Sequence, residues 1–124
     1  MNINGQPVVC SRQLFGDVDA TYLKYFVNHN SFQGIAATVF YEMGNSEIRD
    51  RSVLDPLIAS GKLVIVDLRD IVQDTYRGAS RVVGSEANNA AQFLTHNDCV
   101  NRFRPLEPSW ILSMDMDVLI SYAW

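Results

Sequence analysis

The sequence lacks several features that mark common classes of protein. It contains neither Gly-x-Gly-x-x-Gly nor a Walker-type phosphate loop, which disfavours dinucleotide oxidoreduction and P-loop phosphoryl transfer. It also lacks Gly-x-Ser-x-Gly, the turn that carries the nucleophile of α/β-hydrolases. No uninterrupted apolar run approaches the ~20 residues of a membrane span, and no charged-then-apolar signal segment follows Met1. We therefore expect a soluble chain outside these classes.

Basic residues and cysteines are scarce as well. Ten Lys and Arg residues are scattered among 14 Asp and Glu residues, and the net charge is -4. Because no basic stripe is available to neutralise phosphates, we expect no nucleic-acid partner. The two cysteines, Cys10 and Cys99, could pair in an oxidising compartment, but the sequence does not show whether they meet. Two free buried thiols are the simpler expectation.

The residues that are present predict one α/β domain of 124 residues, without internal repeats or a domain boundary. Apolar, β-rich segments predict strands at 7–11, 35–42, 62–68 and 110–120. Helical patterns lie between them, from Asp17 or Asp19 to about 31, over 47–60 and over 85–103; residues 69–84 show no steady period. Alternating helices and apolar strands predict a mostly parallel sheet with helices on both faces, in a Rossmann-like three-layer arrangement.

Some details of these elements are also predicted. The first helix would bury an aromatic face that includes Tyr22 and Tyr25, and the third helix would bury Phe93. Pro56 lies inside the second helical segment, so that helix either begins near Val53 or bends. The segment 110–120 is rich in large apolar residues, which is typical of a strand buried on both faces.

Four acidic residues lie at the carboxyl ends of the predicted strands: Glu42, Asp67, Asp115 and Asp117. Ligands of parallel sheets bind outside the carboxyl ends of the strands. Residues two apart on a strand project to the same side, so Asp115 and Asp117 would form a carboxylate pair that suits magnesium or manganese. The same D-x-D pattern also occurs in surface loops. His96 lies either on a solvated face or in a stretch turned toward this ligand edge.

Six segments, in order, resemble glycosyltransferase family 92, a group of inverting enzymes with a GT-A type fold. They are Val8-Val-Cys-Ser11 with Leu14-Phe-Gly16, Tyr25-Phe-Val-Asn-His29 with Gly34, Phe40-Tyr-Glu42 with Asn45-Ser46, Val53 to Gly61, Asn97-Asp-Cys-Val-Asn-Arg102, and Trp110 to Asp117. The resemblance covers about residues 7–120. It also accounts for Pro56, since the family has a proline in the corresponding helix end.

The resemblance implies a UDP-sugar donor, most often UDP-galactose, and a glycan acceptor. It implies that manganese bridges Asp117 to the diphosphate, and that Asp115 contacts the ribose or a metal-bound water. Glu42 would face the uridine. The residues that would border the nucleotide are Cys10, Ser11 and Arg12.

The chain departs from the family pattern at several positions. Val118 replaces an acidic residue after the D-x-D motif, and Asn28 and Asn30 replace a Tyr and an Arg. Family members continue into an acceptor-binding half that supplies the catalytic base, and they carry a membrane anchor, often in the Golgi. We therefore expect a donor-binding fragment or truncated member with little or no transfer activity of its own. The alternative from another class is a non-catalytic α/β binding or interaction module.

Overall fold

The four predicted strands form one parallel sheet. The computed structural model of the chain describes residues 2–44, 46–69 and 85–115. Within these residues the strands are ordered β5-β3-β1-β6, and each neighbouring pair is parallel. Their bounds are Val8–Gln13 for β1, Ala37–Glu42 for β3, Leu63–Asp67 for β5 and Ile111–Met114 for β6.

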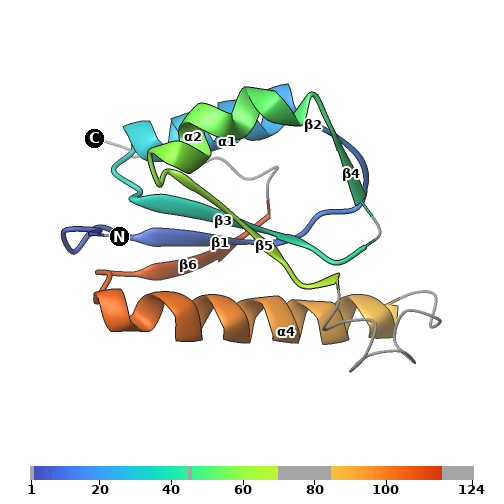
Figure 1. Cartoon of the computed structure of the whole chain (residues 1–124). Coiled ribbons are helices and arrows are strands. Elements are labelled where there is room, and N and C mark those ends of the chain that lie inside the picture. Colours follow the sequence, from blue (N-terminus) through green and yellow to red (C-terminus); the bar gives the residue numbers. More distant parts are fainter. Residues whose placement is uncertain (1, 45, 70–84, 116–124) are drawn as a thin grey trace.

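Helices cover both faces of this sheet. Helices α1 (Ala20–Phe32) and α2 (Asp55–Ala59) lie on one face, and α4 (Ser85–Phe103) lies on the other (Figure 1). The chain steps from β1 to β3 to β5 in one direction and then places β6 on the far side of β1. Because crossovers keep a right-handed sense, this reversal moves α4 to the opposite face. The predicted α/β fold with a Rossmann-like three-layer arrangement is confirmed.

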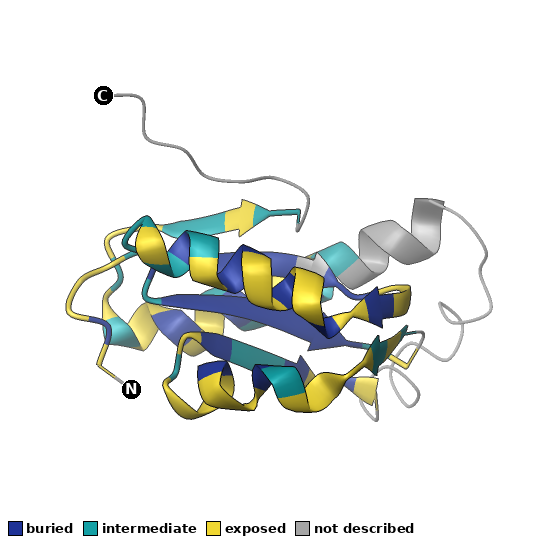
Figure 2. Cartoon of the chain, turned by 90° about the horizontal axis from the view of Figure 1, so that it is seen from above, coloured by how far each residue is buried: buried dark blue, intermediate teal, exposed yellow. Residues whose placement is uncertain are grey.

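Two apolar cores fill the spaces between the layers. Side chains alternate along β3, so Val39 and Tyr41 belong to the core under α4, whereas Phe40 belongs to the core under α1 and α2. All six residues of β3 are buried, which Figure 2 shows as a continuous dark strand. The central strand β3 therefore contributes side chains to both cores.

Helix α1 begins and ends close to where the sequence predicted, but its buried face is different. Asp19 caps it by accepting a hydrogen bond from the Thr21 backbone N–H at 2.9 Å, and Gly34, with φ +91°, follows its end. The prediction that Tyr22 and Tyr25 are buried is wrong, because they are 43% and 58% exposed. The buried residues are Ala20, Leu23, Phe26, Val27 and Asn30.

The helix predicted over 47–60 is wrong in its first half, and the alternative of a start near Val53 is closer to the structure. Ser46–Arg49 forms β4, which pairs in parallel with β2 (Gly16–Asp19), and a 3-10 helix, η1, covers Arg51–Leu54. The α-helix begins only at Asp55, because Pro56 fits the first turn of a helix but lacks the N–H that an interior position needs.

The last two elements also differ in burial from the prediction. Helix α4 has the predicted bounds, but Phe93 is 72% exposed. A 3-10 helix, η3 (Arg104–Leu106), leads to β6, which is only partly buried because it pairs with β1 alone among the described strands. The predictions for residues 70–84 and for Asp117 lie outside the described residues. None of the described helices is long and apolar enough to cross a membrane.

Candidate functional site

The carboxyl ends of β1 and β6 meet where the order of the strands reverses. From β1 the chain runs to β3 and β5 on one side, whereas β6 lies on the other side of β1. Open parallel sheets bind their ligands outside the strand ends at such a switch point. Here Cys10 is paired with Ser113 and Ser11 with Met114, and Asp115 follows directly. The predicted site residues of β1 and β6 are therefore neighbours.

Two further predicted site residues lie at the same edge. Arg12 continues β1, and only its backbone is described. Glu42 ends β3, the next strand along the sheet. From β3 to β6 the sheet spans two inter-strand spacings, or about 10 Å. A ligand of nucleotide size could therefore extend along this edge from Glu42 toward Asp115.

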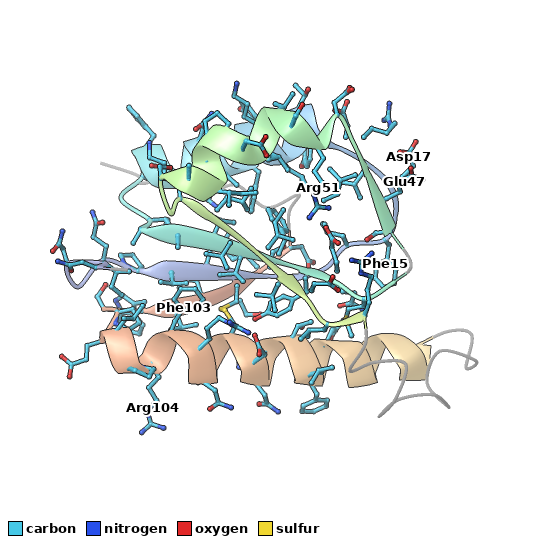
Figure 3. The ribbon with its side chains drawn as sticks, viewed as in Figure 1. Phe15, Asp17, Glu47, Arg51, Phe103 and Arg104 are labelled. Atoms are coloured by element: carbon cyan, nitrogen blue, oxygen red, sulfur yellow. A yellow bond between two sulfur atoms is a disulfide. The ribbon has the colours of Figure 1, made fainter. Side chains whose placement is uncertain are left out.

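An arginine that the sequence analysis did not identify holds Glu42. The Glu42 side chain is 10% exposed and forms an ion pair with Arg51 of η1, which projects toward the sheet in Figure 3. A largely buried carboxylate needs such a partner, because burial removes most of its hydration. The pair forms only because β4 and η1 fold back over the end of β3, and no local motif indicates this.

Asp67 lies beside Glu42 but is engaged by its own arginine. The two acids are paired in register, and Asp67 Oδ1 accepts hydrogen bonds from Arg69 Nε at 2.8 Å and from the Arg69 backbone N–H at 3.0 Å. The Arg69 side chain and then its backbone lower the Asp67 pKa to about 2. Asp67 is therefore an ionised carboxylate that is already paired with Arg69.

An open pocket of about 230 Å³ lies between α4 and the strands β1 and β6. We call it the α4 pocket. Its lining residues are Cys10, Ser11, Gln92, Phe93, Thr95, His96 and Ser113. His96 lines this pocket and is also exposed, so its position is compatible with both alternatives from the sequence.

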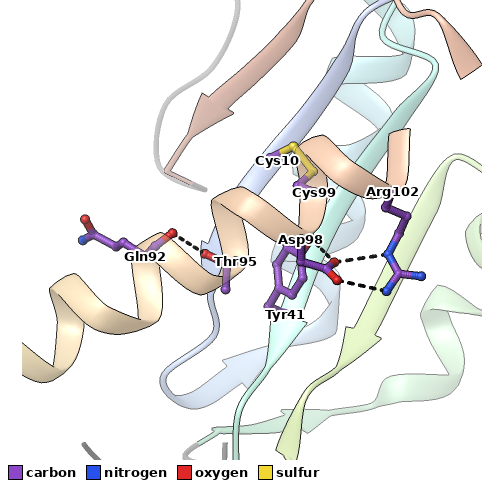
Figure 4. Close-up of a disulfide and its surroundings, with 7 residues drawn as sticks. All are labelled: Cys10, Tyr41, Gln92, Thr95, Asp98, Cys99 and Arg102. Atoms are coloured by element: carbon purple, nitrogen blue, oxygen red, sulfur yellow. Dashed lines mark hydrogen bonds and ion pairs between the residues drawn. A yellow bond between two sulfur atoms is a disulfide. The ribbon is translucent and has the colours of Figure 1, made fainter. Parts of the chain in front are cut away.

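A disulfide and a hydrogen-bonded network fasten α4 next to the α4 pocket. Cys10 and Cys99 are joined, with their Cα atoms 6.1 Å apart (Figure 4). Tyr41 donates its hydroxyl hydrogen to Asp98 Oδ2 at 2.8 Å, and Asp98 also accepts from Arg102 Nε at 3.2 Å. Burial, followed by the bond to Asp98, raises the Tyr41 pKa far above its ordinary value of 10.0.

The expectation of two free thiols is wrong. Cys10 points to the face of β1 that α4 covers, and Cys99 lies on the buried side of that helix. The cysteines are 89 residues apart in the chain, so only the folded arrangement brings them together. The segments Val8 to Ser11, Phe40 to Glu42 and Asn97 to Arg102 all contribute to this fastening.

Of the two expected metal ligands, Asp115 and Asp117, the structure describes only Asp115. Asp115 offers carboxylate oxygens at the switch point, the ligand type that manganese and magnesium prefer. Its expected partner, Asp117, lies outside the described residues. Within residues 2–44, 46–69 and 85–115, no three acidic, histidine or cysteine side chains gather closely enough to hold a metal ion. The carboxylate of Asp115 is of the type that fits the expected metal ion.

Comparison with known proteins agrees with this architecture. The family model for glycosyltransferase family 92 matches residues 6–122. A galactan beta-1,4-galactosyltransferase from Arabidopsis thaliana is 28% identical over 113 residues. That match covers 90% of this chain, and the chain spans about a fifth (20%) of the length of the relative. With the parallel sheet, the switch-point residues and a family match over nearly the whole chain, this protein belongs to glycosyltransferase family 92.

Proposed function

We propose that this chain binds the nucleotide-sugar donor of a glycosyl transfer, with UDP-galactose as the donor and a glycan as the acceptor. The observation that carries the proposal is the meeting of Ser11, Arg12 and Asp115 at the switch point of a family 92 sheet. The named activity of the Arabidopsis relative supports galactose as the transferred sugar. Which glycan serves as the acceptor is not part of the proposal.

In this proposal, each part of the donor would bind at a separate position along the edge of the sheet. Glu42, oriented by Arg51, would accept a hydrogen bond from the uracil ring. Cys10, Ser11 and Arg12 would border the nucleotide, and Asp115 would lie next to the diphosphate or the ribose. The spacing of about 10 Å between β3 and β6 supports this order, because it allows one extended ligand to reach both ends.

The proposal includes manganese at Asp115 and Asp117. When bound, manganese would neutralise the charge that develops on the diphosphate leaving group. The protein would contribute the carboxylates that hold the ion and the strand end that positions them. No residue of this chain is assigned to deprotonating the acceptor, so donor binding is the property to test.

The test is titration calorimetry with UDP in the presence of manganese. We expect the wild-type chain to release heat on binding, and we expect Asp117→Ala to weaken or abolish that heat. Glu107→Gln is the control, because it removes one negative charge from the loop that precedes β6, away from the carboxyl edge. Equal heats for wild type and Asp117→Ala would contradict the metal site.

The same titration separates the donor site from the alternative class. Asp115→Ala should behave like Asp117→Ala, and chelation of manganese in the wild type should reproduce the loss. A well-folded wild-type chain that gives no heat with UDP and manganese would overturn the proposal and favour a non-catalytic α/β binding module.

A further inference from the structure

We propose that the α4 pocket holds a neutral ring with neighbouring hydroxyl groups, contacted by Gln92, His96 and Ser113. Such a ring is either the ribose of the nucleotide or the transferred sugar. The inference rests on the proposed donor binding, and it adds three contact residues that the family resemblance did not indicate. It also assigns a role to His96, which sequence analysis left between two alternatives.

The chemistry of the pocket wall selects a hydroxylated, uncharged ligand. Serine and threonine hydroxyls, an amide and an imidazole line the α4 pocket together with Cys10 and Phe93, and none of the described lining residues is Lys, Arg, Asp or Glu. A phosphate would require a cationic partner and a metal ion would require carboxylates. Sugar hydroxyls both donate and accept hydrogen bonds, which is what Ser, Gln and His side chains can match.

The size of the pocket limits the ligand to one ring. Its volume of about 230 Å³ is below the roughly 300–1,000 Å³ of clefts that enclose drug-sized ligands. A complete nucleotide sugar does not fit into this space. The remainder of the donor would continue outside the pocket, along the carboxyl edge.

The α4 pocket also lies at the right place along β6. Ser113 is paired with Cys10 of β1, and Asp115 follows Ser113 by two residues. Two residues of a strand span about 7 Å, which is close to the distance between a sugar ring and a neighbouring diphosphate. A ring in the pocket would therefore place its phosphate substituent near Asp115.

The helix that carries two of the three contacts is held rigidly. Cys99, three residues after His96, is joined to Cys10 in the pocket wall. Asp98, next to it, is bound to Tyr41 of β3. A helix that is fixed before the ligand arrives favours binding, because no helix movement must be frozen when the ligand binds.

The experiment compares UDP and UDP-galactose, each with manganese, on wild type, Gln92→Ala and His96→Ala. If the ring is the ribose, each variant should bind UDP about threefold to tenfold more weakly, the effect of one lost hydrogen bond. If the ring is the galactose, the variants should bind UDP normally and lose the extra affinity that UDP-galactose has over UDP. Asn97→Ala is the control, because Asn97 is exposed on the same helix and does not line the pocket.

The wild-type chain provides a second test that needs no substitution. For the ribose, 2′-deoxy-UDP should bind more weakly than UDP to wild type, and His96→Ala should reduce that difference. If both variants bind UDP and UDP-galactose like wild type, the pocket assignment is wrong while donor binding stands. If wild type binds neither ligand, both the donor-binding proposal and the assignment of the α4 pocket are wrong.

Discussion

At the scale of single residues, the hydroxyl of Tyr41 connects the sheet to α4 through Asp98. Tyr41→Phe removes this bond and leaves Asp98 with Arg102. We expect the free energy of unfolding to fall by about 1–2 kcal/mol, the value of a hydrogen bond to a charged group that keeps another partner. Urea unfolding measures it. Tyr25→Phe, at a 58% exposed tyrosine of α1, is the matched control and should change stability by less than about 0.5 kcal/mol.

The raised pKa of Tyr41 gives this residue a signature in alkaline solution. Folded Tyr41 keeps its proton above the ordinary pKa of 10.0, whereas the unfolded chain loses it there. The stability from this group is therefore complete below about pH 10 and declines as the pH rises further. In Tyr41→Phe this part of the alkaline decline should disappear. A wild-type chain and a variant with the same dependence above pH 10 would contradict the assignment.

At the scale of elements, the start of α1 depends on one carboxylate. Asp19 accepts from the Thr21 N–H, so Asp19→Ala leaves that amide without its cap. We expect a loss of about 1 kcal/mol of unfolding free energy, measured by thermal or urea unfolding. Asp19→Asn should retain most of the stability, because its side-chain oxygen can cap in the same way. Equal losses for Ala and Asn would indicate a role for the charge instead of the cap.

The elements around the four-stranded sheet could be predicted from the sequence, whereas the two-stranded sheet could not. Helix α4 and the four core strands followed from sustained apolar patterns, although β6 ends at Met114, within the predicted range of 110–120. In contrast, β2 and β4 have four residues each, and their pairing depends on segments about 30 residues apart. The buried face of α1 was misassigned because tyrosine counts as apolar in a periodic pattern, yet its hydroxyl tolerates exposure.

At the scale of the whole molecule, the Cys10–Cys99 bond closes most of the described chain into a loop. We expect Cys10→Ala/Cys99→Ala to unfold with about 3–4 kcal/mol less free energy than the oxidised wild type, because the cross-link restricts the unfolded chain. Denaturant unfolding with and without a reductant measures this. The reductant should lower the unfolding free energy of the wild type and leave that of the double variant unchanged. If full reduction does not change the unfolding free energy of the wild type, the expectation is refuted.

Only part of the candidate site could be predicted from the sequence, because the rest depends on contacts between distant elements. Acidic residues after predicted strands can be placed at one edge from the order of elements alone, as Glu42 and Asp115 were. The pairing of Arg51 with Glu42 and the α4 pocket depend on how distant elements pack together. Tertiary distances of this kind leave no local pattern, so they became visible only in the folded chain.

The position of Cys10 in the first strand has a consequence for synthesis of the chain. Cys10 leaves the ribosome 89 residues before Cys99, an interval of about 5–20 s at ordinary elongation rates. During this interval β1, β3 and β5 can assemble with α1 and α2, while the face that α4 will cover is still open. The Cys10 thiol is therefore not yet covered by α4 during this interval. Correct oxidation follows the arrival of α4, so the emergence of this helix also ends the period in which Cys10 can form a wrong disulfide.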